Sequence, residues 1–286
     1  YCFFNKNNSI DIPAMRDQIS LIKKLGSHGI ACLGLATEVN KLDFIEKKKI
    51  IELVAEISNG SLPLVVTISG RNIKEYKKLI EIATFYNASW IVLQPMLKKN
   101  TTDKDCFEFF NNIIKVINNQ TIVGIQNAKE YIGVGLEPSE IIKLYNKFIN
   151  FRAIKGETSA VLIQKEINKY PNNLKVFNGR GGQEIVDNFL AGCSGIIPSL
   201  EGTDFFLKIY KLIQQKKISE ARKIYKNILP SIVFSMQSID SLVCYGKRIC
   251  AYRMGINKIY DRKPGLTPTN FGIKLAKEFA KDLGKF

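Results

Sequence analysis

The stretch that decides the fold is LPLVVTISGRNIKEYKKLIEIATFYNASWIVLQ, residues 62–94. It begins with a short apolar run, passes through a glycine turn into a segment with the apolar spacing of an amphipathic helix, and ends with a second apolar run. Short strands that are apolar throughout are buried on both faces, as they are in parallel sheets. The stretch therefore predicts a strand–helix–strand unit whose two strands are parallel.

The same alternation recurs along the first two thirds of the chain. Further apolar runs predict strands at IACLGL from residue 30, TIVGIQ from 121, FRAIK from 151, LKVFNG from 174 and SGIIPS from 194, and the opening YCFF predicts one more. Amphipathic segments that predict helices lie between the runs, at residues 14–26, 43–57, 73–86, 104–117 and 138–148. Eight strands alternating with helices are the count of a closed barrel. The predicted fold class is α/β, a (β/α)8 TIM barrel.

After about residue 204 the strands stop, and the remaining segments have helical periodicity only. No linker-like or low-complexity segment separates the two parts. We therefore expect residues 1–203 to form the catalytic barrel and residues 204–286 to form a C-terminal helical extension packed on it. Pro230 is expected to break or kink the middle helical stretch, because proline removes a helical hydrogen bond.

Composition bounds the class of protein. No apolar run approaches the roughly 20 residues of a membrane span, and the first residues lack the layout of a signal peptide, so we expect a cytoplasmic protein without a membrane partner. The six cysteines stand singly beside one histidine, His28, which predicts packing residues and no metal site. A net charge of +16 could indicate nucleic acid, but the lysines scatter without interleaved aromatics, which favours a solvated surface.

The active site of such a barrel lies at the carboxyl ends of its strands. Lys155 is the only lysine that ends one of the predicted strands. An ammonium group in an apolar barrel mouth is desolvated, which favours the neutral amine that a Schiff base nucleophile requires. Spacing alone leaves an alternative open, in which Lys155 pairs with a carboxylate such as Glu38 or Glu157.

Several segments resemble one family of enzymes. These segments are GLATEVNKLDFIEKKKII (34–51), AIKG (153–156), FNGRGGQEIVDNFLAGCSGIIPS (177–199) and RKPGLTP (262–268). They resemble the motifs of the dihydrodipicolinate synthase and N-acetylneuraminate lyase family, and the chain looks like a divergent member. The resemblance implies a class I aldolase-type lyase whose lysine, at Lys155, forms an imine with pyruvate or a longer 2-oxo acid. It implies no cofactor beyond that imine, and a homodimer or homotetramer.

The chain differs from the family at the residue that carries protons during catalysis. The family's proton-carrying tyrosine is replaced by Gln126, an amide that can orient a carbonyl or a water but cannot act as acid or base. Tyr131, in the following loop, is a candidate substitute phenol, although it could equally pack on its neighbours. Glu157 is the other candidate for acid and base work. The predicted catalytic residues are therefore Lys155, Gln126, Tyr131 and Glu157.

The predicted substrate-binding groups follow the same resemblance. The adjacent threonines that hold the oxo acid's carboxylate in the synthase are replaced by Leu35 and Ala36, which leaves backbone N–H groups and the Thr37 hydroxyl. Arg180 stands where the family usually has an acid, and we expect it to bind an anionic group at the distal end of the substrate. Its alternative role is an ion pair with Glu157 or Glu201. The other predicted contacts are Asn127, Gly179, Ile197 and Ser199.

Three functions are consistent with these residues. The first is a Schiff base-forming lyase of the aldolase or dehydratase type, acting on a 2-oxo acid with a distal anionic group. The second is 4-hydroxy-tetrahydrodipicolinate synthase of lysine biosynthesis, which the loss of the tyrosine disfavours. The third is a barrel that binds an oxo acid without turning it over. The sequence favours the first, while the particular oxo acid and the choice among cleavage, dehydration and condensation stay open.

Overall fold

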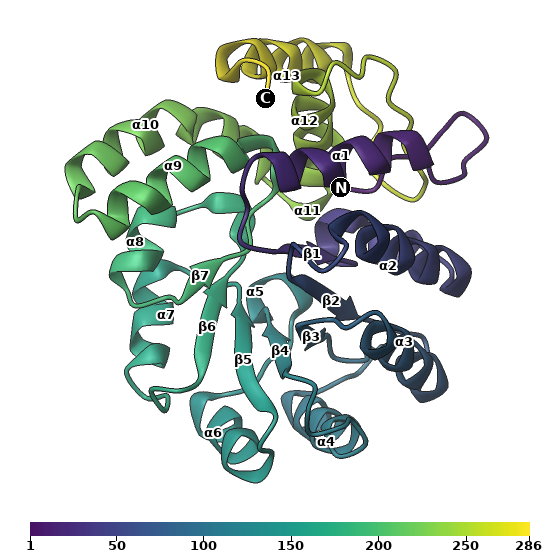
Figure 1. Cartoon of the computed structure of the whole chain (residues 1–286), viewed down its shortest axis with the longest axis vertical. Coiled ribbons are helices and arrows are strands. Elements are labelled where there is room, and N and C mark those ends of the chain that lie inside the picture. The colour runs from purple at the N-terminus through teal and green to yellow at the C-terminus, as the bar shows by residue number, and fades with distance from the viewer.

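The computed structural model describes all 286 residues, and a curled sheet of seven parallel strands forms its centre (Figure 1). The strands are β1 (Ile30–Cys32), β2 (Leu64–Ile68), β3 (Trp90–Leu93), β4 (Val123–Asn127), β5 (Phe151–Gly156), β6 (Lys175–Asn178) and β7 (Gly195–Ile196). Each strand pairs with the next one along the chain, in the order β1 to β7. The predicted alternation is thus confirmed for these seven apolar runs.

Helices alternate with the strands, and all of them except the short α5 cover the outer face of the sheet (Figure 1). They are α1 (Ile12–Lys24), α2 (Phe44–Ser58), α3 (Ile73–Phe85), α4 (Asp103–Ile114), α5 (Lys129–Ile132), α6 (Pro138–Lys147), α7 (Ala160–Ile167) and α8 (Ile185–Leu190). Their starts are set by local chemistry: Asp43 and Glu46 form a capping box at α2, and Pro138 occupies the first turn of α6. The apolar faces of α2, α3 and α4 join the strands in one core of 46 buried residues.

The expected eighth strand is not a barrel strand. Phe4 makes only isolated antiparallel bridges, to Ile10 and to Tyr260. Its ring lies 4.1 Å from the Arg262 guanidinium and 5.3 Å from the Lys247 ammonium, so cation–π contacts hold it against the last third of the chain. The prediction of eight barrel strands was therefore wrong for this segment, and the sheet stays open between β1 and β7.

The C-terminal helices pack on the α8 side and over the top of the barrel in Figure 1. They are α9 (Thr203–Gln214), α10 (Ile218–Ser235), α11 (Ile239–Ser241), a π-helical turn (Leu242–Gly246), α12 (Lys247–Arg253) and α13 (Asn270–Leu283). Helix α10 packs on α8 and α9, and α12 packs on α13. The last third of the chain therefore reaches the strand ends through α12 and the loop that follows it.

Pro230 does not break α10, contrary to expectation, because it lies inside an uninterrupted 18-residue helix. The chain turns instead after Ser235, where the Ser238 hydroxyl caps the next helix by accepting from the N–H of Ser241. No single helix is long and apolar enough to cross a membrane; only residues 218–235 and 239–253 together reach that length and composition, and they are bent by 104°.

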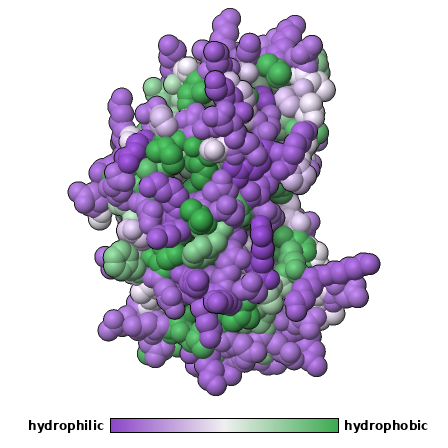
Figure 2. All heavy atoms as spheres, turned by 90° about the vertical axis from the view of Figure 1, so that its right-hand side faces the viewer, coloured by the Kyte–Doolittle hydropathy of each residue, from purple (hydrophilic) through white to green (hydrophobic).

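The surface is largely hydrophilic, and the cysteines are free thiols in the interior. On the face shown in Figure 2, hydrophilic side chains predominate and apolar atoms gather in separate patches. All six cysteines are free and buried. Burial raises the pKa of Cys32, Cys193 and Cys250 to about 12, so these thiols stay protonated and act as small packing residues.

Candidate active site

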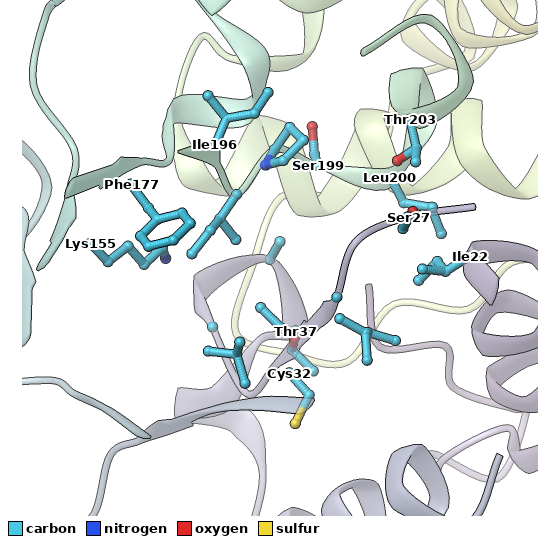
Figure 3. A pocket seen from close by; sticks show the side chains of 18 of the residues that line it. Ile22, Ser27, Cys32, Thr37, Lys155, Phe177, Ile196, Ser199, Leu200 and Thr203 are labelled. Carbon is cyan, nitrogen blue, oxygen red and sulfur yellow. The ribbon is translucent and has the colours of Figure 1, made fainter. Parts of the chain in front are cut away.

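A cavity of about 550 Å³ lies inside the curled sheet. It is bordered by the carboxyl ends of the strands and by the gap between the unpaired edge strands β1 and β7. It continues toward the amino ends of the strands, as far as Ser27 and Ser194, because no strand fills the space between β1 and β7. Figure 3 shows Lys155 and Phe177 on one side of it, with Thr37 and Cys32 across from them. The predicted site residues that line the cavity are Ala36, Thr37, Tyr131, Lys155, Glu157, Arg180, Ile197 and Ser199.

Lys155 lies near the end of β5 with its ammonium group in the cavity wall, and 9% of its side chain is exposed. Its Nζ is 2.8 Å from Oε1 of Glu157, whose side chain is equally buried. The sequence left open whether Lys155 would pair with Glu38 or with Glu157, and in the structure it pairs with Glu157. A buried strand can end on a lysine here because a carboxylate two residues later balances the charge.

A buried chain of hydrogen bonds fixes the other oxygen of that carboxylate. The amide of Gln126 donates to Oε2 of Glu157 at 2.9 Å, and the amide of Gln94 donates to Oε1 of Gln126 at 2.7 Å. Gln126 is 1% exposed and does not line the cavity. Gln126 therefore acts on the cavity only through Glu157. It holds Oε2 of that carboxylate, while Oε1 of Glu157 faces Lys155.

Gly34 leaves free space beside the amine. A Cβ atom built at this position would lie 3.9 Å from Nζ of Lys155 and 4.0 Å from Oγ1 of Thr67, with no other heavy atom within 4 Å. The 3₁₀ turn Leu35–Thr37 follows, and the buried Thr37 also borders the cavity. The amine, two hydroxyls and the backbone of this turn thus surround one small space.

Sequence reasoning missed Thr67, whose buried side chain lines the cavity from β2. The available signal was a polar residue at an alternating position with Val65 in an otherwise apolar strand, since residues i and i+2 of a strand face the same side. Both residues line the cavity. An interior hydroxyl close to Gly34 can hydrogen-bond a substrate oxygen.

Arg180 has partners that were not expected. Its Nη1 is 2.6 Å from Glu184 and its Nη2 is 3.9 Å from Glu130, so the alternative role, an ion pair with Glu157 or Glu201, is not the one in the structure. The physical reason is local, because Arg180 and Glu184 both adopt the left-handed backbone region around a glycine-rich turn that brings them together. The Nε atom of Arg180 is buried and has no hydrogen-bond partner.

Some predicted contacts are occupied by the protein itself. Both amide atoms of Asn127 bond to the backbone of Leu136, at 3.1 and 2.8 Å, and Asn127 does not line the cavity. Gly179 does not line it either; a Cβ at that position would lie 2.7 Å from Oε1 of Glu157, so the glycine makes room for the carboxylate. These two residues support the site rather than face a substrate.

Ser199 lines the cavity, but its hydroxyl donates to Oε1 of Glu201 at 2.8 Å. Glu201 also accepts from the Tyr1 hydroxyl at 2.6 Å, and burial raises the pKa of its carboxyl group. No group of three histidine, cysteine, aspartate or glutamate side chains in the chain is arranged to hold a metal ion. The polar side chains that line the cavity include an amine, a carboxylate, hydroxyls and a guanidinium.

The structure thus has a parallel barrel-type sheet whose cavity contains an ammonium group paired to a carboxylate near the carboxyl end of a strand, the place where barrel enzymes have their active sites. Comparison with known families gives the more particular assignment. Residues 2–278 match the dihydrodipicolinate synthetase family, and the chain belongs to that family. The resemblance drawn from the motifs is thereby confirmed.

The chain is similar to family members with different activities. It is 24% identical over 234 residues to the 4-hydroxy-tetrahydrodipicolinate synthase of Flavobacterium psychrophilum, covering 80% of this chain and 78% of that protein. It is 23% identical over 275 residues to the N-acetylneuraminate lyase of Lactiplantibacillus plantarum, covering 93% and 90%. Both relatives are lyases, and so is this protein.

Solved structures share the fold. The crystal structure of dihydrodipicolinate synthase from Rhodopseudomonas palustris superposes with a TM-score of 0.88 at 17% sequence identity, over 98% of this chain and 94% of that one. At this identity the comparison shows the fold alone. It confirms the fold class predicted from the alternating apolar runs, a TIM barrel with a C-terminal helical part.

Proposed function

We propose that the protein is a Schiff base-forming lyase, of the aldolase or dehydratase type, that acts on pyruvate or a longer 2-oxo acid with Lys155 as nucleophile. The observation that carries this proposal is the position of the Lys155 ammonium group, which lines the cavity 2.8 Å from a carboxylate and faces the free space beside Gly34. A carbonyl carbon placed in that space would be within reach of the amine.

Glu157 supplies the proton transfers in this proposal. Its carboxylate takes a proton from the Lys155 ammonium, and the neutral amine then attacks the carbonyl carbon of the oxo acid. A proton then passes from the nitrogen to the former carbonyl oxygen, which gives the carbinolamine. Glu157 returns its proton to the hydroxyl group, which leaves as water, and the nitrogen remains in a protonated imine. The protonated imine can take up the electron pair of a bond at the adjacent carbon, so that a carbon–carbon or carbon–hydrogen bond there can break. Gln126 cannot replace Glu157 in these steps, because an amide does not exchange a proton near neutral pH.

The carboxylate of the oxo acid would bind at the turn that starts at Gly34, where Leu35, Ala36 and Thr37 border the cavity. The N–H of Thr37 already donates to the carbonyl of Gly34, so the N–H groups of Leu35 and Ala36 and the Thr37 hydroxyl would hold the carboxylate. Arg180 is the group we assign to a distal anion. Arg180 lines the same cavity, and 17% of its side chain is exposed. A ligand anion would compete there with Glu184, which already occupies Nη1.

Reduction with borohydride in the presence of pyruvate, followed by intact-mass measurement, tests the nucleophile. We expect an adduct on the wild-type protein and on Lys175→Ala, a control that removes an exposed lysine at the start of β6, and no adduct on Lys155→Ala. No adduct on the wild type with any 2-oxo acid would refute the lyase proposal. An adduct on Lys155→Ala would assign the chemistry to another lysine.

The distal anion is tested by a pair of longer 2-oxo acids that differ only in a terminal carboxylate or methyl group. We expect the acid with the terminal carboxylate to be trapped at lower concentration, and Arg180→Gln to remove that preference. Equal trapping of both acids by the wild-type protein would assign Arg180 to the support of the loop alone.

A further inference from the structure

Glu38 is a buried carboxylate that the proposed chemistry does not use. It follows Thr37 directly and lies between two short 3₁₀ turns, with a left-handed backbone at φ 57°. Non-glycine residues adopt this conformation at an energetic cost, and they keep it only where surrounding contacts enforce it. The contacts that hold Glu38 therefore also set the shape of the turn that precedes it.

Two lysines hold the carboxylate of Glu38. Nζ of Lys247 is 2.6 Å from Oε1, and Nζ of Lys41 is 2.6 Å from Oε2. Lys247 is the first residue of α12 and is fully buried. Its ammonium group also donates to the carbonyl of Cys2 and lies 3.7 Å from Asp261. A buried ammonium group is tolerated when it is paired in this way, whereas removing one partner leaves an uncompensated charge.

The second lysine is held by the same part of the chain. Nζ of Lys41 donates to the carbonyl of Arg262 at 3.0 Å, and Arg262 forms a two-pronged ion pair with Glu46, with both bonds at 2.7 Å. The turn before Glu38 is thus fixed through both oxygens of one carboxylate. One contact comes from α12, and the other comes from Lys41 in the turn after Glu38, which the loop after α12 holds in place.

We propose that Lys247 is a positioning residue for the active site. It holds Glu38 in the left-handed conformation, and Glu38 in turn orients the turn at Gly34–Thr37, whose N–H groups and hydroxyl meet the carboxylate of the oxo acid. This inference rests on the proposed function. It gives the C-terminal helices a role in substrate binding, although none of their charged groups touches the substrate.

The test measures pyruvate trapping and thermal unfolding in parallel. Lys247→Met removes the charge and keeps most of the side-chain volume. We expect it to raise the pyruvate concentration for half-maximal trapping about tenfold while the adduct formed at saturation is unchanged, because misplacing a binding group by a fraction of an ångström weakens binding. Lys247→Arg, which restores the charge, should recover most of that loss.

Asp204→Asn is the matched control. It breaks the two-pronged pair of Asp204 with Arg253, both bonds at 2.9 Å, which lies in the same helical part and does not touch the turn. We expect this variant to lose thermal stability and to keep the wild-type half-saturation. If Lys247→Met does not fold, Glu38→Gln replaces it and should give the same shift in half-saturation.

The outcomes separate the two proposals. A wild-type protein that traps no oxo acid overturns the proposed function, and the positioning role with it. The positioning role alone is overturned if the wild-type protein traps pyruvate but Lys247→Met or Glu38→Gln needs the same pyruvate concentration for half-maximal trapping as Asp204→Asn does. A lower adduct yield at saturation, with half-saturation unchanged, also overturns it.

Discussion

Gly34→Ala separates activity from stability, because the new methyl group meets the substrate and not the protein. Gly34 has φ −79° and ψ −175°, an extended conformation that alanine adopts without strain. The nearest heavy atoms to the added Cβ are Nζ of Lys155 and Oγ1 of Thr67, at 3.9 and 4.0 Å, which are ordinary contact distances. A glycine-to-alanine change at a compatible site stabilises a protein by about 0.4 to 1 kcal/mol, because it restricts the unfolded chain.

Whereas Gly34→Ala is expected to stabilise the fold, it is expected to slow the reaction at Lys155. A carbonyl carbon about to be attacked lies about 3 to 3.5 Å from the amine, and the methyl group would occupy the space on the Gly34 side of Nζ. A displacement of about 1 Å at this stage costs about 100-fold in rate, or about 2.7 kcal/mol. We therefore expect Gly34→Ala to form the imine about 100 times more slowly.

The assay follows the rate of pyruvate adduct formation under borohydride, together with thermal unfolding of the same samples. Slow trapping with an unchanged or slightly higher melting temperature is the expected result. Trapping at the wild-type rate would show that the carbonyl does not occupy the space beside Gly34. A variant that is both slow and unstable would show that the methyl group clashes with the protein, which contradicts the geometry described above.

Four further predictions test the site and the fold. Glu157→Gln should slow imine formation about 100-fold or more, because the proton acceptor is lost, and adduct at wild-type rate would exclude that role. Thr67→Val should slow trapping about tenfold by removing one hydrogen bond, and Thr67→Ser should restore it; equal rates for both variants would exclude a contact by the hydroxyl. A thiol reagent at pH 8 should label none of the six buried cysteines until the protein is unfolded, and labelling of the native protein would show that a thiol is accessible. Burial alone would raise the pKa of Glu75, but hydrogen bonds from the N–H of Arg71 and from Lys47 lower that pKa below its ordinary value. The ionised Glu75 carboxylate therefore stabilises the fold near neutral pH, and this stabilisation is lost as the pH falls through the lowered pKa. Glu75→Gln should therefore lower the melting temperature at pH 7, with a difference that narrows below about pH 4, and a constant difference would contradict this linkage.

The sequence predicted the sheet well because its signal is local. A parallel strand that is buried on both faces is mostly apolar, so the run itself identifies it, and each of the seven strands lies in one of the predicted apolar runs. YCFF has the same composition, yet Phe4 bridges Ile10 and Tyr260, since its pairing depends on cation–π contacts with residues near the other end of the chain. Composition identifies an apolar segment but does not choose its partner.

The site shows the same division between local and distant causes. Lys155 could be found because it is a lysine at the end of an apolar strand. Its partner could not be chosen from spacing, because Glu38 is taken by Lys247, which lies 209 positions away in the sequence. Thr67 was missed because one polar residue in an apolar strand does not reveal that it faces the amine across the cavity. The protein partners of Arg180 could not be predicted, because the left-handed turn that brings it to Glu184 depends on backbone angles.

The pairing of Glu38 with Lys247 has a consequence for biosynthesis. During translation the first strand and its turn leave the ribosome long before α12 does, so Glu38 can pair with Lys247 only after that lysine, 209 positions later, has also been synthesised. Contacts between such distant positions form late and slow folding. A nascent chain that ends before Lys247 already contains Lys155, yet Glu38 then has only Lys41 as an ion-pair partner. Under the proposed function, the site is therefore completed only after Lys247 has been made, well after the strand that carries Lys155.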